Sequence, residues 1–374
     1  MLSLVLFLLA FAWVVWVLFG YGMLLGMLAQ GNYPEPFQHF EPRSVTVLLA
    51  VHNGERWLRD KLNSLLALDY PPELLHIIVI SDGSTDSTVS IAREFADRGV
   101  ECLTVPKGGK ALALTSGMAR AKGEILFFTD VRQPLDPGSL RELVSYFADA
   151  TVGVVSGELI IREGDSSEES NVGRYWSYEK SIRMKLSKID SVLGATGCIY
   201  AMRRSLAKPM PAGCLLDDMY LPLNAFFQGY RVLFDSKARA YDQPTSLDSE
   251  FRRKVRTLAG VYQVIGYFPA LLDPTANRMW IHFVSHKLGR LLVPFALLIL
   301  LITAPFLPWP LNLLMVVGQL FFYGLAWLDL FLSEKNPLKK VTSPIRTFVV
   351  LMTASLAASS ILFRPGDSFW RPTR

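Results

Sequence analysis

Long apolar blocks near both ends of the chain place the strongest constraint on its fold. Residues 2–29 form a nearly uncharged block, and about 20 apolar residues suffice to cross the hydrocarbon core of a bilayer. The block lacks a basic leading region and a small-residue cleavage site, so we interpret it as a membrane anchor rather than a removed signal peptide. Three further apolar blocks follow near the other end, at about 288–308, 311–333 and 345–363.

The segment between the first and second blocks has mixed polarity and is long enough for one globular domain with its own core. We therefore predict four regions along the chain. They are an N-terminal transmembrane helix over 1–30, a globular domain over 40–250, amphipathic interface helices over 251–287, and a C-terminal transmembrane region with a short basic tail over 288–374.

Lys and Arg residues predict which side of the membrane the domain faces. Most of them occur in the globular segment and in the loop 334–346, so the positive-inside bias predicts a cytoplasmic domain at the inner (plasma) membrane. If all four blocks cross the membrane, both termini and the basic tail lie outside, which fits the positive-inside bias poorly. The topology of the last block therefore stays open. The net charge of +5 suits contact with anionic lipids, although ordinary solubility explains it equally well. We assign the three cysteines to packing, since their spacing is not that of a metal site.

Strand and helix patterns alternate in the first half of the domain, which predicts a parallel α/β sheet with right-handed crossovers. The strands are expected at 44–51, 74–81, 101–105 and in the run that ends at Asp130, and the helices at 54–68, from the SDGS turn to about 98, and at 109–121. After about residue 153 the pattern loosens into an α+β region. It contains strands at 152–161 and 197–204, with a helix near 171–189 between them.

Polar residues follow the expected strands where each one ends, which is where ligands bind in open α/β sheets. Asp82 ends the second strand inside SDGS, and a carboxylate there can accept hydrogen bonds from a base or ribose. The alternative is a plain turn with a helix cap. His52 and Glu55 follow the first strand at the same rim, where a solvated loop is the alternative.

The segment PKGGKALALTSG, residues 106–117, places two glycines and Lys110 before a helix start. Backbone amides and the helix dipole favour anions there, and Lys110 adds a positive charge. The pattern is not a P-loop and also occurs by chance.

Asp130 ends the next strand, and Arg132 follows two residues later. Asp130 can hold a metal or contact a ribose and diphosphate, while Arg132 can offer forked hydrogen bonds to phosphate oxygens. The alternative is a strand-end salt bridge between or beyond them.

Adjacent carboxylates, Asp217 and Asp218, stand at the expected start of a helix. Their repulsion can raise one pKa into the range of a general base. The alternative is an acidic first turn stabilised by the helix dipole.

A basic run at 251–256 precedes an apolar stretch. It predicts an amphipathic helix at the membrane face. A second interpretation directs Arg253 and Arg256, which share a helical face, at a leaving diphosphate.

Taken in order, these clusters resemble the membrane-embedded family 2 glycosyltransferases, the group that includes cellulose, hyaluronan and poly-N-acetylglucosamine synthases and the nodulation chitooligosaccharide synthases. The resemblance covers roughly residues 40–290 and implies a GT-A fold, which is Rossmann-like, that binds a nucleotide-sugar, usually a UDP-sugar, with divalent Mg²⁺ or Mn²⁺.

Residue by residue, the resemblance gives each cluster a role. VHNGERWL and Asp82 correspond to the contacts with the nucleobase, and Lys110 to the lysine near the phosphates. Asp130 corresponds to the first carboxylate of the DxD metal motif, and Arg132 replaces the second. Asp218 corresponds to the general base, and GATGCIY (194–200) resembles the acceptor-side segment. The QxxRW motif survives only in part, through Arg256, with its Gln and Trp replaced.

The resemblance implies an inverting transfer of a sugar from a nucleotide-sugar to a growing polysaccharide. Alternatives are the addition of one sugar to a polyprenyl-linked acceptor, and a non-catalytic membrane scaffold that kept a degraded domain. Expected partners are the nucleotide-sugar donor, a glycan or lipid-linked glycan acceptor and membrane lipids, with an oligomer or export partner left open and no nucleic acid expected.

Overall fold

The computed structural model describes residues 1–161, 167–243 and 247–369. The chain divides into two compact units, which we describe separately. The sheet unit comprises Gly31–Arg162 and Lys180–Gln243, and the helical unit comprises Met1–Gln30, Glu163–Glu179 and Pro244–Arg374. The long helix α7 (Ser167–Ile189) contributes residues to both units.

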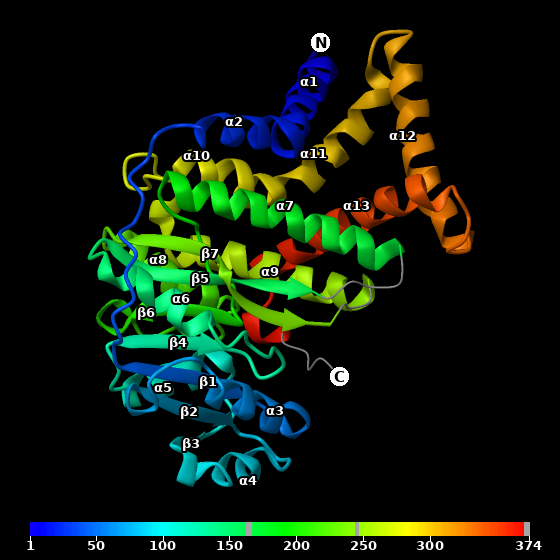
Figure 1. Ribbon diagram of the computed structural model, residues 1–374. Helices are drawn as coiled ribbons and strands as arrows, with labels where there is room; N and C mark the ends of the chain where they lie inside the picture. Colours follow the sequence, from blue (N-terminus) through cyan, green and yellow to red (C-terminus); the bar gives the residue numbers. More distant parts are fainter. Residues whose placement is uncertain (162–166, 244–246, 370–374) are drawn as a thin grey trace. The chain divides into compact units, whose positions relative to one another are not determined.

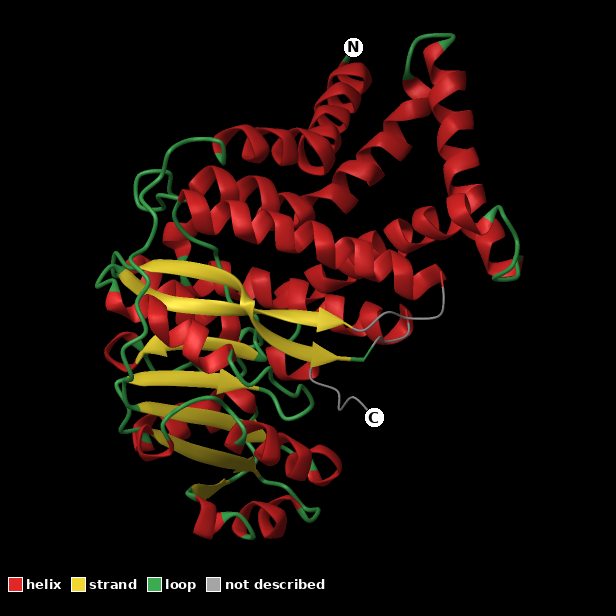
Figure 2. Cartoon of the chain, in the orientation of Figure 1, coloured by secondary structure: helices red, strands yellow, loops and turns green. Residues whose placement is uncertain are grey.

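Seven strands form one sheet in the order β3-β2-β1-β4-β6-β5-β7 (Figure 1; Figure 2). The pairs of β1 with β2 and β4, and of β2 with β3, are parallel, as the alternating pattern predicts. The carboxyl ends of β1, β2 and β4 therefore meet at one edge of the sheet. The strands are β1 (Val45–Val51), β2 (Leu75–Asp82), β3 (Val100–Val105), β4 (Ile125–Thr129), β5 (Val152–Ile161), β6 (Ile199–Arg203) and β7 (Arg231–Asp242).

The other half of the sheet departs from the purely parallel pattern. Strand β6 runs antiparallel to both β4 and β5, and β7 pairs parallel to β5 at the edge. Sequence patterning missed β7, because its outer half alternates polar and apolar residues around Ala238 and Ala240 without a strongly apolar run. The end of β7 lies beside the turn after β4, where Asp242 contacts Arg132.

Helices α3 (Glu55–Leu66), α4 (Thr88–Arg93), α5 (Lys110–Arg120), α6 (Ser139–Ser145) and α8 (Asp217–Phe227) accompany the sheet. Helix α3 buries Leu58, Leu62 and Leu65 fully, because these positions share one helical face. The helix expected to reach residue 98 instead ends at Arg93. A short 3₁₀ turn follows and closes on Gly99, whose φ of +82° suits glycine.

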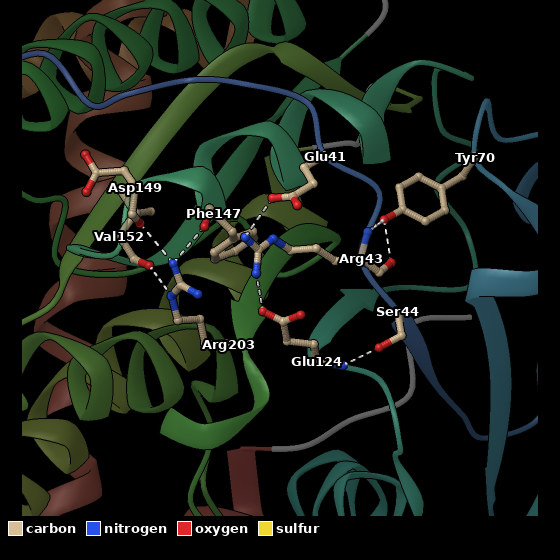
Figure 3. A network of polar contacts seen from close by, with 9 residues as sticks. All are labelled: Glu41, Arg43, Ser44, Tyr70, Glu124, Phe147, Asp149, Val152 and Arg203. Atoms are coloured by element: carbon tan, nitrogen blue, oxygen red, sulfur yellow. Dashed lines mark hydrogen bonds and ion pairs between the residues drawn. The ribbon is translucent and has the colours of Figure 1, made fainter.

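A polar network ties the strand starts together at the opposite edge of the sheet (Figure 3). The Arg203 guanidinium donates to the carbonyls of Phe147, Asp149 and Val152 at 2.8–2.9 Å. Arg43 pairs with Glu124, and its backbone carbonyl accepts a 2.6 Å bond from the Tyr70 hydroxyl. Hydrogen bonds and ion pairs therefore hold this side of the sheet together.

The helical unit contains four helices that are long and apolar enough to cross a membrane. Their bounds are Leu2–Leu28, Trp280–Phe306, Leu311–Phe331 and Lys339–Leu362. All four apolar blocks expected from the sequence are therefore helical, and the second begins earlier than expected. The component helices are α1 (Leu2–Val15), α2 (Tyr21–Leu28), α9 (Leu247–Tyr267), α10 (Trp280–His282), α11 (Gly289–Thr303), α12 (Leu311–Leu328) and α13 (Lys339–Ala358).

Polar contacts link helices inside the helical unit, including the part of α7 that belongs to it. The Tyr21 hydroxyl lies 3.2 Å from His282 Nδ1, and Arg290 donates to Glu179 at 2.6 Å. Near the end of α12, the buried Asp329 pairs with Lys339 at 3.2 Å and accepts a bond from the Thr342 hydroxyl. These contacts satisfy polar groups that would otherwise be costly in an apolar environment.

Candidate functional site

The loops after β1 and β2 are tied to each other at the edge where the parallel strands end. His52 Nδ1 lies 2.6 Å from the carbonyl oxygen of Asp82, and Glu55 accepts a 2.9 Å bond from the backbone amide of Ser87. The amide of Glu55 in turn donates to Asp86. The structure thus brings His52, Glu55 and Asp82 to one rim, as the sequence predicts, with Glu55 engaged in holding the rim together.

The carboxylate of Asp82 anchors the glycine-rich loop before α5. Its two oxygens accept hydrogen bonds from the amides of Gly108 at 2.7 Å and Gly109 at 3.0 Å. Gly109 has a φ of +88°, and Gly83 has a φ of +58° with the Lys107 backbone at 2.8 Å from where a Cβ would stand. Glycine is therefore required at both positions, and Asp82 sets where α5 begins.

Lys110, the first residue of α5, joins two carboxylates from separate elements. Its Nζ lies 2.9 Å from Asp130 Oδ1 and 3.1 Å from Asp217 Oδ2. Burial by itself lowers the pKa of Lys110, but the carboxylates of Asp130, Asp217 and Asp218 outweigh it and hold the pKa well above its usual value. The ammonium is therefore charged at neutral pH and gathers the acidic residues into one cluster.

The acidic pair begins α8 and rests on the segment GATGCIY. The amide of Ala195 donates to the Asp218 carbonyl at 2.6 Å, and a Cβ on Gly197 would stand 3.0 Å from Asp218 Oδ2. Asp217 is buried, whereas Asp218 is half-buried. The glycine at 197 thus leaves room for the Asp218 carboxylate beside the segment that the sequence assigns to the acceptor side.

Arg132 forms a salt bridge at the end of β7. Its guanidinium lies 3.1 Å from Asp242 Oδ2 at the end of β7, and Gln133 Nε2 donates to the same oxygen at 2.6 Å. Asp130 pairs with Lys110 instead, so among the described residues Asp130 and Arg132 do not pair with each other. The salt bridge that the sequence left open as an alternative is therefore present, and it extends to Asp242.

Comparison with known proteins assigns the segment that carries most of this site to a family. Residues 46–210 match the family described as Glycosyl transferase family 2. This segment is a family 2 glycosyltransferase domain. The strand ends, the glycine loop and Asp130 all fall within it, whereas Asp217 and Asp218 follow shortly after.

Relatives and a solved structure agree with the domain assignment. The chain is 26% identical over 283 residues to a probable glycosyltransferase, YdaM, of Bacillus subtilis (68% of this chain, 66% of that protein). It is 25% identical over 282 residues to a poly-beta-1,6-N-acetyl-D-glucosamine synthase of Staphylococcus epidermidis (68% and 67%). The chain therefore spans about two thirds of the length of these relatives.

The fold of the glycosyltransferase domain also occurs in a solved structure. A mannosyltransferase from Pyrobaculum calidifontis, in complex with GDP-Man and Mn²⁺, superposes with a TM-score of 0.74 at 22% identity, covering 96% of this chain and 99% of that one. This likeness shows the fold alone. It agrees with the GT-A architecture expected from the sequence.

A divalent metal at this rim would be held largely by its ligand. Within the described ranges, no three His, Cys, Asp or Glu side chains form a group that could hold a metal ion on their own. The Tyr200 hydroxyl is buried without a hydrogen-bond partner among the described residues, whereas Asp217 Oδ2 has Lys110 Nζ at 3.1 Å. A Mg²⁺ or Mn²⁺ ion commonly binds through one carboxylate and substrate phosphates, and Asp130 can supply that carboxylate.

Arg253 and Arg256 belong to α9, in the helical unit, and their role at the glycosyltransferase site stays a prediction. Within that unit Arg253 pairs with Glu250, which is 1% exposed. Lys254 Nζ lies 3.7 Å from the same carboxylate. The basic run is therefore partly engaged in contacts along its own helix.

Sequence reasoning missed Lys61 in α3. It is 1% exposed, and its Nζ donates to Thr129 Oγ1 at 2.7 Å and to the Gln133 carbonyl at 2.5 Å. Burial lowers the pKa of Lys61 to about 7. A signal was available, because Lys61 stands on the same helical face as Leu58, Leu62 and Leu65, where an apolar residue is expected.

Proposed function

We propose that this chain is an inverting glycosyltransferase that moves a sugar from a nucleotide-sugar to a growing polysaccharide at the inner membrane. The proposal rests on one observation above all, the position of Lys110 Nζ within 3.1 Å of both Asp130 and Asp217. That contact brings together Lys110, which would bind phosphate, Asp130, which would bind a metal, and the start of α8. The family 2 relatives support the same reaction class.

The donor would bind at the rim formed by the loops after β1, β2 and β4. His52 and Asp82 would face the nucleoside, and Lys110 and Asp130 would face the diphosphate. A divalent cation, when bound, supplies positive charge to the diphosphate oxygens. We keep UDP-sugars as the first candidates, and GDP-sugars enter as a comparison because the solved mannosyltransferase was captured with GDP-Man.

Asp218 would act as the general base. The acceptor hydroxyl would lose its proton to this carboxylate as its oxygen attacks the anomeric carbon, and the bond to the donor diphosphate would break. An α-linked donor would then give a β-linkage. Asp217, held by Lys110, would keep Asp218 in place, and Lys110 would stabilise the charge that develops on the departing diphosphate.

The four apolar helices support a membrane location for this reaction. By the positive-inside bias, the domain would lie on the cytoplasmic side. The addition of a single sugar to a polyprenyl-linked acceptor is the second candidate, and the replaced Trp of the QxxRW motif favours it because an aromatic platform for a polymer is missing.

A donor screen tests the proposal. The full-length chain in lipid nanodiscs would be incubated with radiolabelled UDP-sugars and GDP-mannose, with and without Mn²⁺ or Mg²⁺, and both hydrolysis and product length would be measured. A ladder of products supports the synthase, and a single addition supports the second candidate. The Asp218→Asn variant should lose transfer by a factor of about 10² to 10⁴ and keep nucleotide binding.

Two results would count against this assignment. Turnover retained by Asp218→Asn would remove the proposed base. Undetectable binding of every nucleotide-sugar would favour the non-catalytic scaffold over an enzyme.

A further inference from the structure

Lys61 carries a buried amine whose hydrogen-bond partners are both uncharged. Its Nζ donates to a hydroxyl, Thr129 Oγ1, and to a backbone carbonyl, that of Gln133. Among the described residues no carboxylate lies within ion-pair distance of it. Burying a charge without a paired counterion costs free energy, whereas an apolar residue would pack on the same face at no such cost. Lys61 therefore does something that packing alone does not require.

The contacts of Lys61 bracket the turn that carries Asp130. Thr129 is the last residue of β4, and Gln133 closes the turn that follows it. The Thr129 hydroxyl in turn donates to the Cys198 carbonyl at 2.8 Å, just before β6, and so links Lys61 to that strand. The Lys61 amine thus contacts both ends of the turn 130–133 from the α3 side.

Asp242 holds the same turn from the β7 side. Its Oδ2 accepts from Arg132 at 3.1 Å and from Gln133 Nε2 at 2.6 Å, while its Oδ1 accepts the amide of Gln243 at 2.9 Å. The Asp242 side chain is only 14% exposed, so these bonds are largely shielded from water. Arg132 and Gln133, the second half of the turn, are therefore both held by hydrogen bonds.

We propose that Lys61 and Asp242 are positioning residues that clamp the turn 130–133 and thereby aim Asp130 at the donor diphosphate. In this role Arg132 is part of the clamp, and its guanidinium acts on the donor through the position of Asp130. The inference rests on the proposed function, since it needs Asp130 to face the donor. A single carboxylate must hold its geometry closely when no second one from the turn shares the metal, which accounts for a clamp on both flanks.

Binding of UDP and GDP to the full-length chain in nanodiscs, measured by calorimetry with and without Mn²⁺, tests the clamp. The Lys61→Met and Asp242→Ala variants should lose about 10- to 100-fold in the Mn²⁺-dependent part of nucleotide affinity and little in the metal-independent part. General loss of structure would lower both parts together. Arg59→Met, on the same helix but with its pair to Glu94 half exposed, is the matched control and should bind as the wild type does.

Two further variants keep the test decisive if Lys61→Met folds poorly. Thr129→Val removes one acceptor of Lys61 without changing charge, and should produce a smaller loss of the same kind. Arg132→Met removes the pair with Asp242 without placing a second carboxylate beside Asp130, and should also produce a loss of the same kind. If Lys61→Met, Asp242→Ala and Thr129→Val all bind nucleotide with the Mn²⁺-dependent affinity of the wild type, the clamp is overturned and the proposed function is not. A wild-type chain that binds neither nucleotide overturns the proposed function and the clamp with it.

Discussion

Lys110 of α5 and Asp217 of α8 form an ion pair of 3.1 Å, with side chains only 19% and 9% exposed. The contact lacks the alignment of a hydrogen bond, since Asp217 Oδ2 has no such partner among the described residues. The same ammonium contacts Asp130 at 2.9 Å. One charge therefore links the proposed donor side of the site to the helix that carries the proposed base.

Replacing Lys110 tests this link. Lys110→Met removes the counterion of Asp130 and Asp217 and a positive charge near the departing diphosphate, so we expect kcat to fall about 100-fold. Transfer of the radiolabelled donor sugar measures the change. Lys107→Met, in the same loop but exposed, is the control and should retain its activity. An equal loss in both variants would contradict a specific role for Lys110.

Metal removal tests Asp130. We expect EDTA to abolish transfer by the wild-type chain and added Mn²⁺ to restore it. Asp130→Asn should raise the Mn²⁺ concentration needed for half-maximal rate by about 10- to 100-fold, because the one carboxylate that the turn supplies is lost. A metal titration at saturating donor measures this shift. Unchanged metal dependence in Asp130→Asn would place the ion elsewhere.

The space beside Asp218 gives a third prediction. In Gly197→Ala the new methyl group would stand 3.0 Å from Asp218 Oδ2, so the carboxylate must move by a few tenths of an ångström. We expect kcat to fall about 10-fold with nucleotide affinity unchanged, since the base would be misplaced. Steady-state kinetics separate the two effects. Gly138→Ala, where no atom lies within 4 Å of the new Cβ, should be neutral.

The buried Lys61 predicts a pH dependence of stability. Its pKa is about 7 in the folded chain, against about 10.4 for an exposed lysine, so between these values the unfolded chain binds a proton that the folded chain lacks. Stability from this residue must therefore rise with pH. We expect the free energy of unfolding of the wild type, relative to Lys61→Met, to increase by about 2 kcal/mol from pH 7 to pH 9. Thermal unfolding in detergent measures it, and a flat difference would refute it.

Arg203 should matter for stability and not for chemistry. Arg203→Met leaves the carbonyls of Phe147, Asp149 and Val152 without their donor, which should cost about 2 kcal/mol. We expect the apparent Tm to fall by several degrees while the nucleotide affinity of the remaining folded chain is unchanged. Arg120→Met, which removes the pair between the 61% exposed Arg120 side chain and Glu101, should shift the Tm little. Equal Tm shifts in the two variants would show that the Arg203 network stabilises the fold no more than an exposed ion pair does.

Local patterns in the sequence predicted much of the fold. Apolar runs and helical faces reflect neighbours only a few residues apart, so the parallel strands β1 to β4, helices α3 and α5 and the four apolar helices could be predicted. Strand ends also predicted that His52, Asp82 and Asp130 lie at one edge, because parallel strands share that edge. The family 2 assignment followed from the same residues.

Only the tertiary structure decided which charges meet. The partner of Arg132 is Asp242, because β7 joins the sheet beside β5 and its end reaches the turn after β4. Lys110 meets Asp217 because α8 begins next to the start of α5, although the two residues are far apart in the sequence. Such pairs depend on how strands order themselves across a sheet, and the pattern of a single strand carries no information about its neighbours. The sequence by itself determined where the chemistry gathers, and packing across the sheet determined how each charge there is held.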